Sequence, residues 1–341
     1  MALLEVEDLH VSFNTPDGVL KAVRGLSFSV EEGKTLGIVG ESGSGKSVST
    51  QTIMGLTRGA RIAGQARFQG EDLLGMTDHQ LQRIRGAKVG MIFQDPLSSL
   101  HPYYRVGWQI VEMIQAHDKQ VSKEKAQARA IDLLRLVGIP QPDRRVHDFP
   151  HQFSGGMRQR AMIAMAMALN PILLIADEPT TALDVTVQAQ VLQVMQRLQE
   201  EFGTAIIMIT HDLGVIAEMA DDVVVMYAGK VMEQADRNTT FYEQHNPYTE
   251  GLLLSLPAYG GDRERLVPIA GQPPSLITLP QGCPFRPRCP YAFDKCVEDP
   301  SLEEVGRATH LSACWLPTDM RKRKKLRQQL LSQSAEPAEA Q

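Results

Sequence analysis

Residues 40–47 carry the phosphate-binding pattern Gly-x-x-x-x-Gly-Lys-Ser, which constrains the fold of this chain more than any other feature. An apolar run at 35–39 precedes the pattern and a helix-compatible run at 48–56 follows it, the strand–loop–helix order that a P-loop requires. Backbone N–H groups and the helix N-terminus of such a loop cradle phosphate oxygens. The flanking runs disfavour a merely flexible Gly/Ser loop. The predicted phosphate-binding residues are Gly40, Glu41, Ser42, Gly43, Ser44, Gly45, Lys46 and Ser47.

The remaining landmarks decide which class of P-loop protein this is. Lys46 is expected to reach the β- and γ-phosphates and Ser47 to hold Mg²⁺, but kinases, GTPases, helicases and transporter ATPases all share this chemistry. Further along the chain come, in order, Gln94, Ser154-Gly155-Gly156, Asp177-Glu178, Thr181-Ala182-Leu183-Asp184 and Thr210-His211-Asp212. This order resembles the nucleotide-binding subunit of an ATP-binding-cassette (ABC) transporter.

The resemblance implies a role for each landmark in ATP hydrolysis. A hard cation prefers oxygen ligands and retains waters, and the residues expected at Mg²⁺ are Ser47, Gln94 and Asp177. Glu178 is expected to be the general base that accepts a proton from the attacking water. His211 is expected to contact the γ-phosphate and to help position that water. Phe13 resembles the aromatic residue that stacks on adenine in this family, with an ordinary core aromatic as the alternative.

The segment Ser154-Gly155-Gly156 is expected to act on a nucleotide bound by another subunit. Serine is a preferred N-cap, and the helix that follows presents free N–H groups to an anion. In transporter ATPases this anion is the γ-phosphate held by the opposite subunit, so the resemblance implies two ATPase subunits with two ATP molecules between them. Asp184 corresponds to the D-loop of the family. A merely well-capped core helix is the alternative, but it does not explain the paired glycines.

Length and patterning predict an α/β fold with one large domain and a smaller appendage. The 341 residues fit a P-loop NTPase of the ABC cassette type over 1–255, with a RecA-like, mostly parallel sheet, a small antiparallel β subdomain and a helical subdomain at about 95–155. A Cys-containing extension over 256–318 and a basic, then Ala/Glu/Pro-rich tail over 319–341 follow. In importers the helical subdomain receives a coupling helix from the membrane subunit. Tyr103, Tyr104 and Trp108 are candidates either for that groove or for the core.

Composition and segment lengths argue against several other classes. The longest near-apolar stretch, 161–176, is interrupted by Asn170-Pro171 and is too short to span a bilayer. The acidic first residues do not resemble a signal peptide. A formal net charge of −5 argues against a nucleic-acid partner. A soluble ABC ATPase acting on DNA or ribosomes would need two fused cassettes or a long inserted arm, and the sequence shows neither.

All four cysteines lie in the extension, at Cys283, Cys289, Cys296 and Cys314. Five, six and seventeen residues separate them, and the C-x-x-C pairs of a zinc ribbon are absent. Structural disulfides are disfavoured in a reducing cytosol, whereas four thiolates can ligate a [4Fe-4S] cluster. Arg286, Arg288 and Lys295 would offset the negative charge of a cluster. From the spacing alone, a cluster, a zinc site and four reduced thiols all stay open.

The sequence of the extension also indicates which group of ABC transporter ATPases the chain resembles. Residues 282–292, together with Asn246-Pro247-Tyr248-Thr249, are similar to the C-terminal region of peptide-importer ATPases, and the chain resembles the bacterial dipeptide and oligopeptide permease ATPases to about residue 318, nearest to the dipeptide branch. The resemblance implies a [4Fe-4S] cluster on the four cysteines, with zinc as the alternative.

The resemblance also implies where the protein works and with what partners. The location expected is the cytoplasmic face of the bacterial membrane. The partners expected are a second ABC ATPase subunit, two membrane permease subunits and, indirectly, a peptide-binding protein on the outer side, with no nucleic acid. Oligopeptide, nickel and antimicrobial-peptide transporters of the same type are the alternatives for the cargo.

Overall fold

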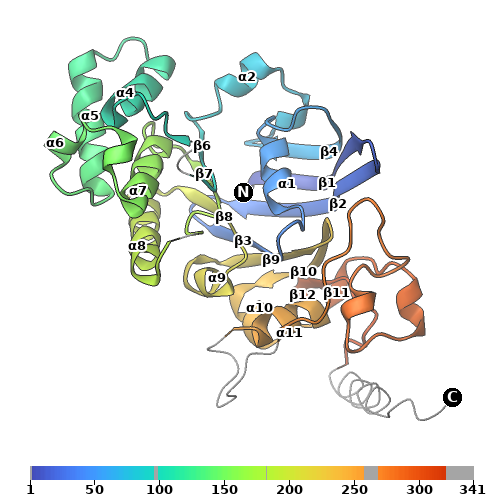
Figure 1. The fold of residues 1–341 in the computed structure, drawn as a ribbon. Coiled ribbons are helices and arrows are strands. Elements are labelled where there is room, and N and C mark those ends of the chain that lie inside the picture. Colours follow the sequence, from blue (N-terminus) through green and yellow to red (C-terminus); the bar gives the residue numbers. More distant parts are fainter. Residues whose placement is uncertain (1, 96–98, 182, 257–267, 320–341) are drawn as a thin grey trace.

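The computed structural model of the chain describes residues 2–95, 99–181, 183–256 and 268–319. Ala182 of the predicted D-loop motif and residues 320–341 of the predicted tail therefore lie outside the described residues. Two β-sheets and a lobe of helices make up the fold (Figure 1).

An eight-stranded sheet with the order β11-β12-β10-β9-β3-β8-β7-β6 forms the centre of the molecule. The strands from β9 to β6 pair in parallel, and β9, β10, β12 and β11 pair antiparallel. Strands β3, β7 and β8 are buried along their whole length, as parallel strands covered on both faces must be. The bounds, in sheet order, are β11 Glu303–Val305, β12 Arg307–Ser312, β10 Lys230–Asp236, β9 Asp222–Tyr227, β3 Thr35–Val39, β8 Ala205–Thr210, β7 Leu173–Asp177 and β6 Val89–Ile92.

A four-stranded antiparallel sheet covers one face of the central sheet. Its order is β2 (Gly18–Glu31), β1 (Ala2–Thr15), β4 (Ala60–Phe68) and β5 (Glu71–Asp72). Buried and exposed residues alternate along much of β1 and β2, so one side of the sheet packs inward. Leu4 and Leu26 from this sheet share a hydrophobic core with Ile38 and Ile207 of the central sheet and Ile53 of helix α1 (Lys46–Ile53).

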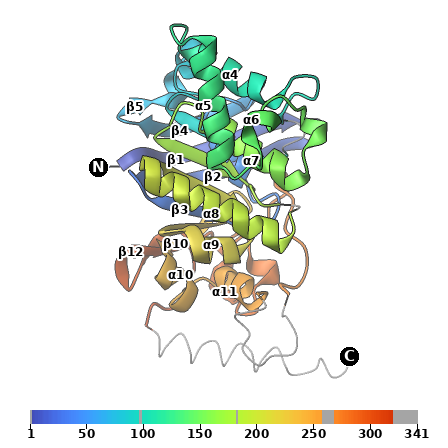
Figure 2. The same cartoon turned by 90° about the vertical axis from the view of Figure 1, so that its left-hand side faces the viewer.

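Several helices cover the other face of the central sheet or form the lobe beside it. Figure 2 shows α8 lying across the front of the sheet, with α7 above it. Ile110, Leu133 and Ile163 from three of these helices enter one hydrophobic core with residues of β7 and β8. These helices are α4 Val106–His117, α5 Lys123–Leu136, α6 Pro142–Arg145, α7 Gly155–Ala166, α8 Val185–Phe202 and α9 Leu213–Met219.

Local signals set the ends of several helices. Ser122 accepts a hydrogen bond from the Lys125 N–H at 3.3 Å and so caps α5. Gly203 adopts a φ of 65° and ends α8, a conformation that glycine adopts without a steric penalty. The remaining short helices are α2 Asp78–Gln82, α10 Arg237–Tyr242, α11 Pro247–Leu254, η1 Leu73–Gly75, η2 Pro150–Gln152, η3 Arg286–Arg288 and η4 Asp294–Val297.

The extension is built onto the edge of the central sheet. Strand β12 pairs with β10, with Leu311 opposite Gln234, and β11 pairs with β12. Phe285 is 2% exposed and packs against Tyr227 and Tyr248. The predicted α/β cassette with a largely parallel sheet, an antiparallel β subdomain and a helical lobe is confirmed. Its antiparallel edge was not predicted, because β11 and β12 are short and largely polar.

Among the described residues, no helix combines the length and the apolar character that a bilayer span requires. Tyr103, Tyr104 and Trp108 of the helical lobe are not core residues, since they are 82%, 46% and 42% exposed. Tyr104 stacks on Trp108 with ring centroids 4.3 Å apart. The core alternative for these three side chains is therefore wrong.

Candidate nucleotide site

The predicted site residues meet at one edge of the central sheet. The loop 40–45 follows β3, His211 follows β8, Glu178 follows β7, and Gln94 lies two residues after β6. These four strands are neighbours and run parallel, so their carboxyl ends lie side by side. Open α/β sheets place ligand sites at such an edge.

Two glycines let the phosphate-binding loop pack tightly against its surroundings. Gly40 has a φ of 150° and Gly45 a φ of 98°, both outside the range that other residues readily adopt. A Cβ at Gly40 would collide with the Met226 carbonyl, and one at Gly45 would collide with the Ala22 carbonyl. The backbone N–H groups can therefore curve around an anion only because these positions have no side chain.

Lys46 begins α1 and folds back across the loop. Its Nζ donates hydrogen bonds to the carbonyl oxygens of Gly40 at 2.7 Å and Glu41 at 3.0 Å. The residue is 4% exposed, and this burial lowers the pKa of the ammonium, against the opposing charges of Glu178 and Asp177. These carbonyl partners are neutral, so an incoming phosphate would meet a buried cation whose closest partners do not cancel its charge.

Ser47 and Asp177 come together as the predicted magnesium pair. The Ser47 hydroxyl donates to Asp177 Oδ1 at 2.7 Å, which joins the start of α1 to the end of β7. Asp177 is 2% exposed, and its burial raises the pKa of the carboxyl while the hydrogen bond from Ser47 lowers it. The two oxygen-bearing side chains have the chemistry that a hard divalent cation prefers, and its charge would stabilise the buried carboxylate.

One carboxylate oxygen of Glu178 is contacted by the other predicted catalytic residue, His211, and by Gln94, which was predicted at Mg²⁺ but bonds to Glu178 rather than to Ser47 or Asp177. Oε2 accepts hydrogen bonds from Gln94 Nε2 at 3.0 Å and from the Thr181 hydroxyl at 2.8 Å, and His211 Nδ1 lies 3.5 Å away. Glu178 has a φ of 49°, an uncommon conformation for a residue with a side chain, of the kind that clusters at functional sites. Its own N–H donates to the Ile209 carbonyl at 2.8 Å, which fixes this backbone.

Thr181 is a site residue that the sequence motifs do not predict. It lies three residues after Glu178, and the sequence pattern indicates it only as the first residue of the D-loop motif. The sequence offers one signal for this role, because a threonine hydroxyl in a turn tends to form a hydrogen bond with a nearby group. Together with Gln94 it fixes the direction in which Glu178 Oε2 points.

The segment Ser154-Gly155-Gly156 is arranged as an open helix N-terminus. The Ser154 hydroxyl accepts from the Met157 N–H at 3.3 Å, and among the described residues no atom beyond the adjoining residues and the backbone of α7 itself lies within 4 Å of where a Gly155 Cβ would be. A Cβ at Gly156 would instead run into Val187 of α8. Within the described ranges, no hydrogen bond or ion pair joins residues 154–156 to residues 40–47. The helix end therefore stands apart from the loop of its own chain.

Asp184 and Phe13 have local structural roles. The Asp184 side chain caps α8 by accepting from the Val187 N–H at 3.0 Å. Phe13 lies in β1 between Leu20 and Ala60 of the neighbouring strands and packs partly against a hydrophobic core. This contact matches the core-aromatic alternative, and stacking of Phe13 on adenine stays a prediction.

The four cysteines of the extension line one cavity, together with Arg286 and Phe285. None forms a disulfide. Burial raises the pKa of Cys283, and it raises the pKa of Cys289 and Cys314 to about 12, so these are thiols unless a cation lies beside them. In the part of the chain that the structure describes, no three His, Cys, Asp or Glu side chains form a group that could hold a metal ion.

The two other basic residues predicted to offset a cluster have other partners. The Lys295 ammonium lies 3.9 Å from the centroid of the Trp315 ring. Arg288 points away to the phosphate-binding loop, where it pairs with Glu41. Of the features expected for an iron–sulfur cluster, the described residues thus show only the shared cavity and Arg286 in its wall.

Comparison with protein families gives two matches. The model described as "ABC transporter" matches residues 23–181, and the one described as "Oligopeptide/dipeptide transporter, C-terminal region" matches residues 232–296. A solved structure, "Dimeric structure of a post-hydrolysis state of the ATP-binding cassette MJ0796 bound to ADP and Pi", is similar with a TM-score of 0.63 and 26% identity, and the match covers 69% of this chain and 98% of that one.

Curated relatives match over nearly the whole chain. "Oligopeptide transport ATP-binding protein OppD" of Escherichia coli (strain K12) is 50% identical over 321 residues, which is 93% of this chain and 94% of the relative. "Dipeptide transport ATP-binding protein DppD" of Lactococcus lactis subsp. cremoris (strain MG1363) is 49% identical over 317 residues, covering 92% and 90%. The chain therefore belongs to the ABC transporter family, in the group of transport ATPases that carry the oligopeptide/dipeptide C-terminal region.

Proposed function

We propose that this chain binds MgATP in the loop 40–47 and hydrolyses it to drive the import of dipeptides or oligopeptides through a membrane permease. The observation that carries the proposal is the meeting of Ser47 with Asp177, and of Gln94 and His211 with Glu178, beside this loop at one edge of the sheet. Relatives named for oligopeptide and for dipeptide transport are about equally similar, at 50% and 49% identity, so both cargo sizes belong to the proposal.

Each side chain has a task in phosphoryl transfer, which depends on positioning and on charge stabilisation. The loop N–H groups and Lys46 hold the phosphates, and Ser47 and Asp177 hold and orient Mg²⁺. When bound, the cation neutralises developing charge on the phosphate oxygens. Glu178 accepts the proton of the attacking water, and Gln94 and Thr181 fix the direction of its carboxylate. His211 lies on the open side of the group, 57% exposed, where a γ-phosphate can reach it.

The proposal is tested with the complex that co-purifies with this chain. We expect its ATPase activity to rise when peptide and the peptide-binding protein are added, and Lys46→Ala to weaken nucleotide binding itself. Identification of the co-purifying membrane subunits gives the cargo class. A complex without permease subunits, or one whose ATPase ignores peptide, would contradict the transport role.

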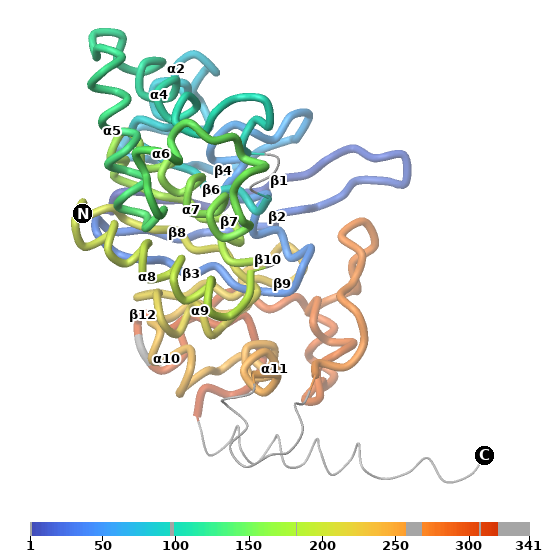
Figure 3. The backbone as a smooth tube through the Cα atoms, turned by 60° about the vertical axis from the view of Figure 1, so that its left-hand side comes forward, coloured from blue at the N-terminus to red at the C-terminus, as the bar shows by residue number. Residues whose placement is uncertain are grey.

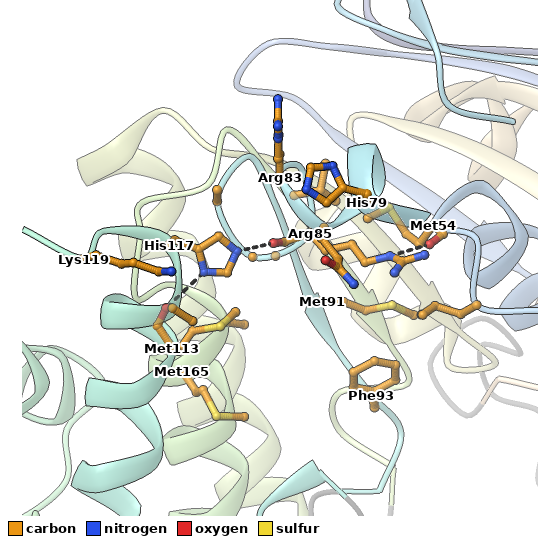
Figure 4. A pocket seen from close by; sticks show the side chains of 18 residues that line it. Met54, His79, Arg83, Arg85, Met91, Phe93, Met113, His117, Lys119 and Met165 are labelled. Carbon is orange, nitrogen blue, oxygen red and sulfur yellow. Dashed lines mark hydrogen bonds between the residues drawn. The ribbon is translucent and has the colours of Figure 1, made fainter. Parts of the chain in front are cut away.

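An apolar groove between the helical lobe and the sheet is the proposed docking site for the permease. It has a volume of about 850 Å³ and includes Met91 and Phe93 from β6 and the residue after it, and Met113 from α4 (Figure 4). Phe93 immediately precedes Gln94, whose side chain donates a hydrogen bond to Glu178. An occupant of the groove that contacts Phe93 would therefore lie one residue from this pair. We therefore propose that a helix of the membrane subunit occupies this groove. The exposed aromatics Tyr103, Tyr104 and Trp108 do not line it.

A bulky charge in this groove should uncouple the ATPase from the permease. Ala116 is exposed on α4 and lines the groove, so Ala116→Arg should fill it without removing a core contact. We expect the affinity of the variant for the permease to fall at least about tenfold, the usual effect of losing a well-packed interface contact. The exposed Ala128 on α5 is outside the groove, and Ala128→Arg is the matched control. Equal permease binding by both variants would exclude the groove.

We further propose that the four cysteines hold a [4Fe-4S] cluster. Support comes from their common cavity and from the basic Arg286 in its wall, because a thiolate-ligated cluster is anionic. A single zinc ion requires all its sulfur ligands to lie about 2.3 Å from one point. A [4Fe-4S] cubane is larger than one ion, so it suits cysteine sulfurs that line a cavity without meeting around a single point. When bound, the cluster would supply cationic iron to stabilise the four thiolates that line this cavity.

Anaerobically purified protein should be brown and contain about four iron atoms per chain if all four thiolates hold a cubane. Cys289→Ser should remove the iron and loosen residues 280–316, while ATP binding at Lys46 survives because the cassette has its own cores. Iron analysis and amide hydrogen exchange measure these outcomes. Stoichiometric zinc without iron would replace the cluster by a zinc site, and neither metal would leave four reduced thiols.

The remaining partners follow from the same proposal. The exposed N-terminus of α7 fits a γ-phosphate on a second ATPase subunit, which in the peptide-importer group is a different chain. The complex would then sit at the cytoplasmic face of the bacterial membrane, with two permease subunits and an external peptide-binding protein. Crosslinking between a cysteine placed at Ser154 and the loop of the second subunit would report the arrangement, and crosslinks only between identical chains would favour a homodimer.

A further inference from the structure

The extension reaches the phosphate-binding loop through Arg288. Its Nη1 and Nη2 lie 2.6 Å and 2.9 Å from the two carboxylate oxygens of Glu41, the second residue of the loop. The two residues are 247 positions apart in the sequence, and the Arg288 side chain is only 5% exposed. A two-pronged, largely buried pair of this kind is stronger and more directional than an ordinary surface ion pair.

The Arg288 side chain is itself held from several sides. Its Nε donates to the Ala270 carbonyl at 2.9 Å, and Nη1 also donates to the Tyr227 hydroxyl at 3.2 Å. The guanidinium lies 5.7 Å from the centroid of the Tyr227 ring and 6.0 Å from that of Phe285. The hydrogen bonds to Glu41 are the largest cause of a raised pKa of Arg288, so the group is always charged. These contacts fix the guanidinium of Arg288 in one position, unlike a mobile charge on the surface.

A second contact holds the backbone of the same loop residue. The Glu41 N–H donates to the Tyr248 hydroxyl at 2.9 Å, and Tyr248 is completely buried. Tyr248 packs against Tyr227 and Phe285, with ring centroids 4.6 Å and 5.2 Å away. Phe285 belongs to the extension and precedes Arg288 by three residues. The side chain and the N–H of Glu41 are therefore both anchored to one aromatic cluster.

The extension also touches the β1–β2 hairpin, which carries Phe13. The Leu276 carbonyl accepts from the Lys21 N–H at 3.1 Å, and Ile277 lies against Gly18 at the start of β2. Figure 3 shows the end of this hairpin and the extension side by side. The extension thus contacts both the phosphate-binding loop and the hairpin predicted to meet adenine.

We propose that Arg288 is a positioning residue for the nucleotide site, through which the extension holds the phosphate-binding loop in its binding shape. The proposal rests on the proposed placement of ATP in this loop. The ion pair neutralises Glu41, whose carboxylate would otherwise repel phosphate, and it fixes the residue that follows Gly40. Because coupling between two sites is reciprocal, ATP in the loop must also stabilise the extension around Arg288. Cys289 follows directly in the chain, so the same residue connects the cysteine cavity with the loop.

The experiment measures MgATP binding to full-length chains that differ at this pair. Arg288→Gln leaves Glu41 charged and should weaken MgATP binding about tenfold, the change that follows from losing one good charged contact. Arg288→Lys should fall between this variant and the wild type, since an ammonium cannot form the two-pronged pair. Adding Glu41→Gln to Arg288→Gln should restore most of the affinity, a non-additivity that marks direct coupling. The KM for ATP should rise while kcat changes less than about twofold, since positioning acts on binding.

Asp299→Asn is the matched control. Asp299 pairs with Arg24 at 3.5 Å and with Lys230 at 2.7 Å, so this variant also cuts ion pairs between the extension and the cassette, but none at the loop. It should bind MgATP as the wild type does. Amide hydrogen exchange gives an independent readout, because MgATP should slow exchange at residues 285–289 of the wild type and do so much less in Arg288→Gln.

The possible results distinguish a failure of the role of Arg288 from a failure of the proposed placement of ATP in the loop. Wild-type affinity in Arg288→Gln, together with lost binding in Lys46→Ala, would overturn the role of Arg288 and leave the nucleotide site intact. Equal weakening by Arg288→Gln and Asp299→Asn would also overturn it, because general loosening of the extension would then be the cause. Wild-type binding by Lys46→Ala would remove ATP from this loop and the inference with it.

Discussion

The Glu178→Gln variant should lose ATP hydrolysis by roughly 10²–10⁴-fold, the contribution that a positioned general base usually makes, while it still binds MgATP. The amide keeps the shape of the side chain, and the hydrogen bonds with Gln94 and Thr181 can be retained. What disappears is the carboxylate that we propose accepts the proton of the attacking water. Single-turnover hydrolysis and nucleotide binding, measured side by side, separate the two effects.

The measurement requires an assembly in which the second ATPase site is inactive. Glu200→Gln is a matched control, because Glu200 is an exposed glutamate on α8 and lies outside the site. This variant should hydrolyse ATP as the wild type does. Near wild-type hydrolysis by Glu178→Gln would remove Glu178 from the role of base.

The Ser154→Arg variant should damage the ATP site of the opposite subunit rather than its own. A long cationic side chain would occupy the space at the open N-terminus of α7, where backbone N–H groups must approach the γ-phosphate. Loss of such donors typically costs about 10²–10³-fold in rate. The expected result is wild-type ATP binding at Lys46 and lost hydrolysis at the site whose phosphate-binding loop belongs to the partner.

Ser122→Arg provides the matched control for this prediction. Ser122 caps α5 as Ser154 caps α7, each hydroxyl accepting a backbone N–H at 3.3 Å, so both variants lose the same kind of cap. Only Ser154→Arg should affect hydrolysis. A monodisperse monomer with full ATPase activity would contradict the composite site.

The meeting of Asp177, Glu178 and His211 beside the phosphate-binding loop could be predicted because these residues follow strands of a parallel sheet. Once the runs at 35–39, 89–93, 172–176 and 205–209 are taken as parallel neighbours, Asp177, Glu178 and His211 must lie at the same edge as the phosphate-binding loop. Glycine patterns then fix the loop itself, since Gly40 and Gly45 have no room for a side chain.

Contacts between distant, irregular segments could not be predicted in this way. The pair of Glu41 and Arg288 joins a loop to a short 3₁₀ turn, and neither segment has a periodic pattern that specifies its neighbour. Sequence proximity to Cys289 instead suggested that Arg288 offsets the charge of a metal cluster. The direction in which a side chain leaves such a turn depends on packing, here against Tyr227 and Phe285.

The strands of the extension escaped prediction for a related reason. β11 and β12 are short and rich in charged and polar residues, such as Glu303 and His310, and they pair only because β10 presents an open edge. Their pairing depends on tertiary context rather than on a local strand pattern.

Peptide uptake into sealed vesicles that contain the co-purified complex would show whether ATP hydrolysis by this chain drives peptide import. With the peptide-binding protein outside and MgATP inside, we expect the wild type to accumulate a labelled di- or oligopeptide against its gradient. A complex carrying Glu178→Gln should show none, although it retains ATP binding. Accumulation that persists with Glu178→Gln, or that fails with an active wild-type ATPase and all subunits present, would contradict the proposed function.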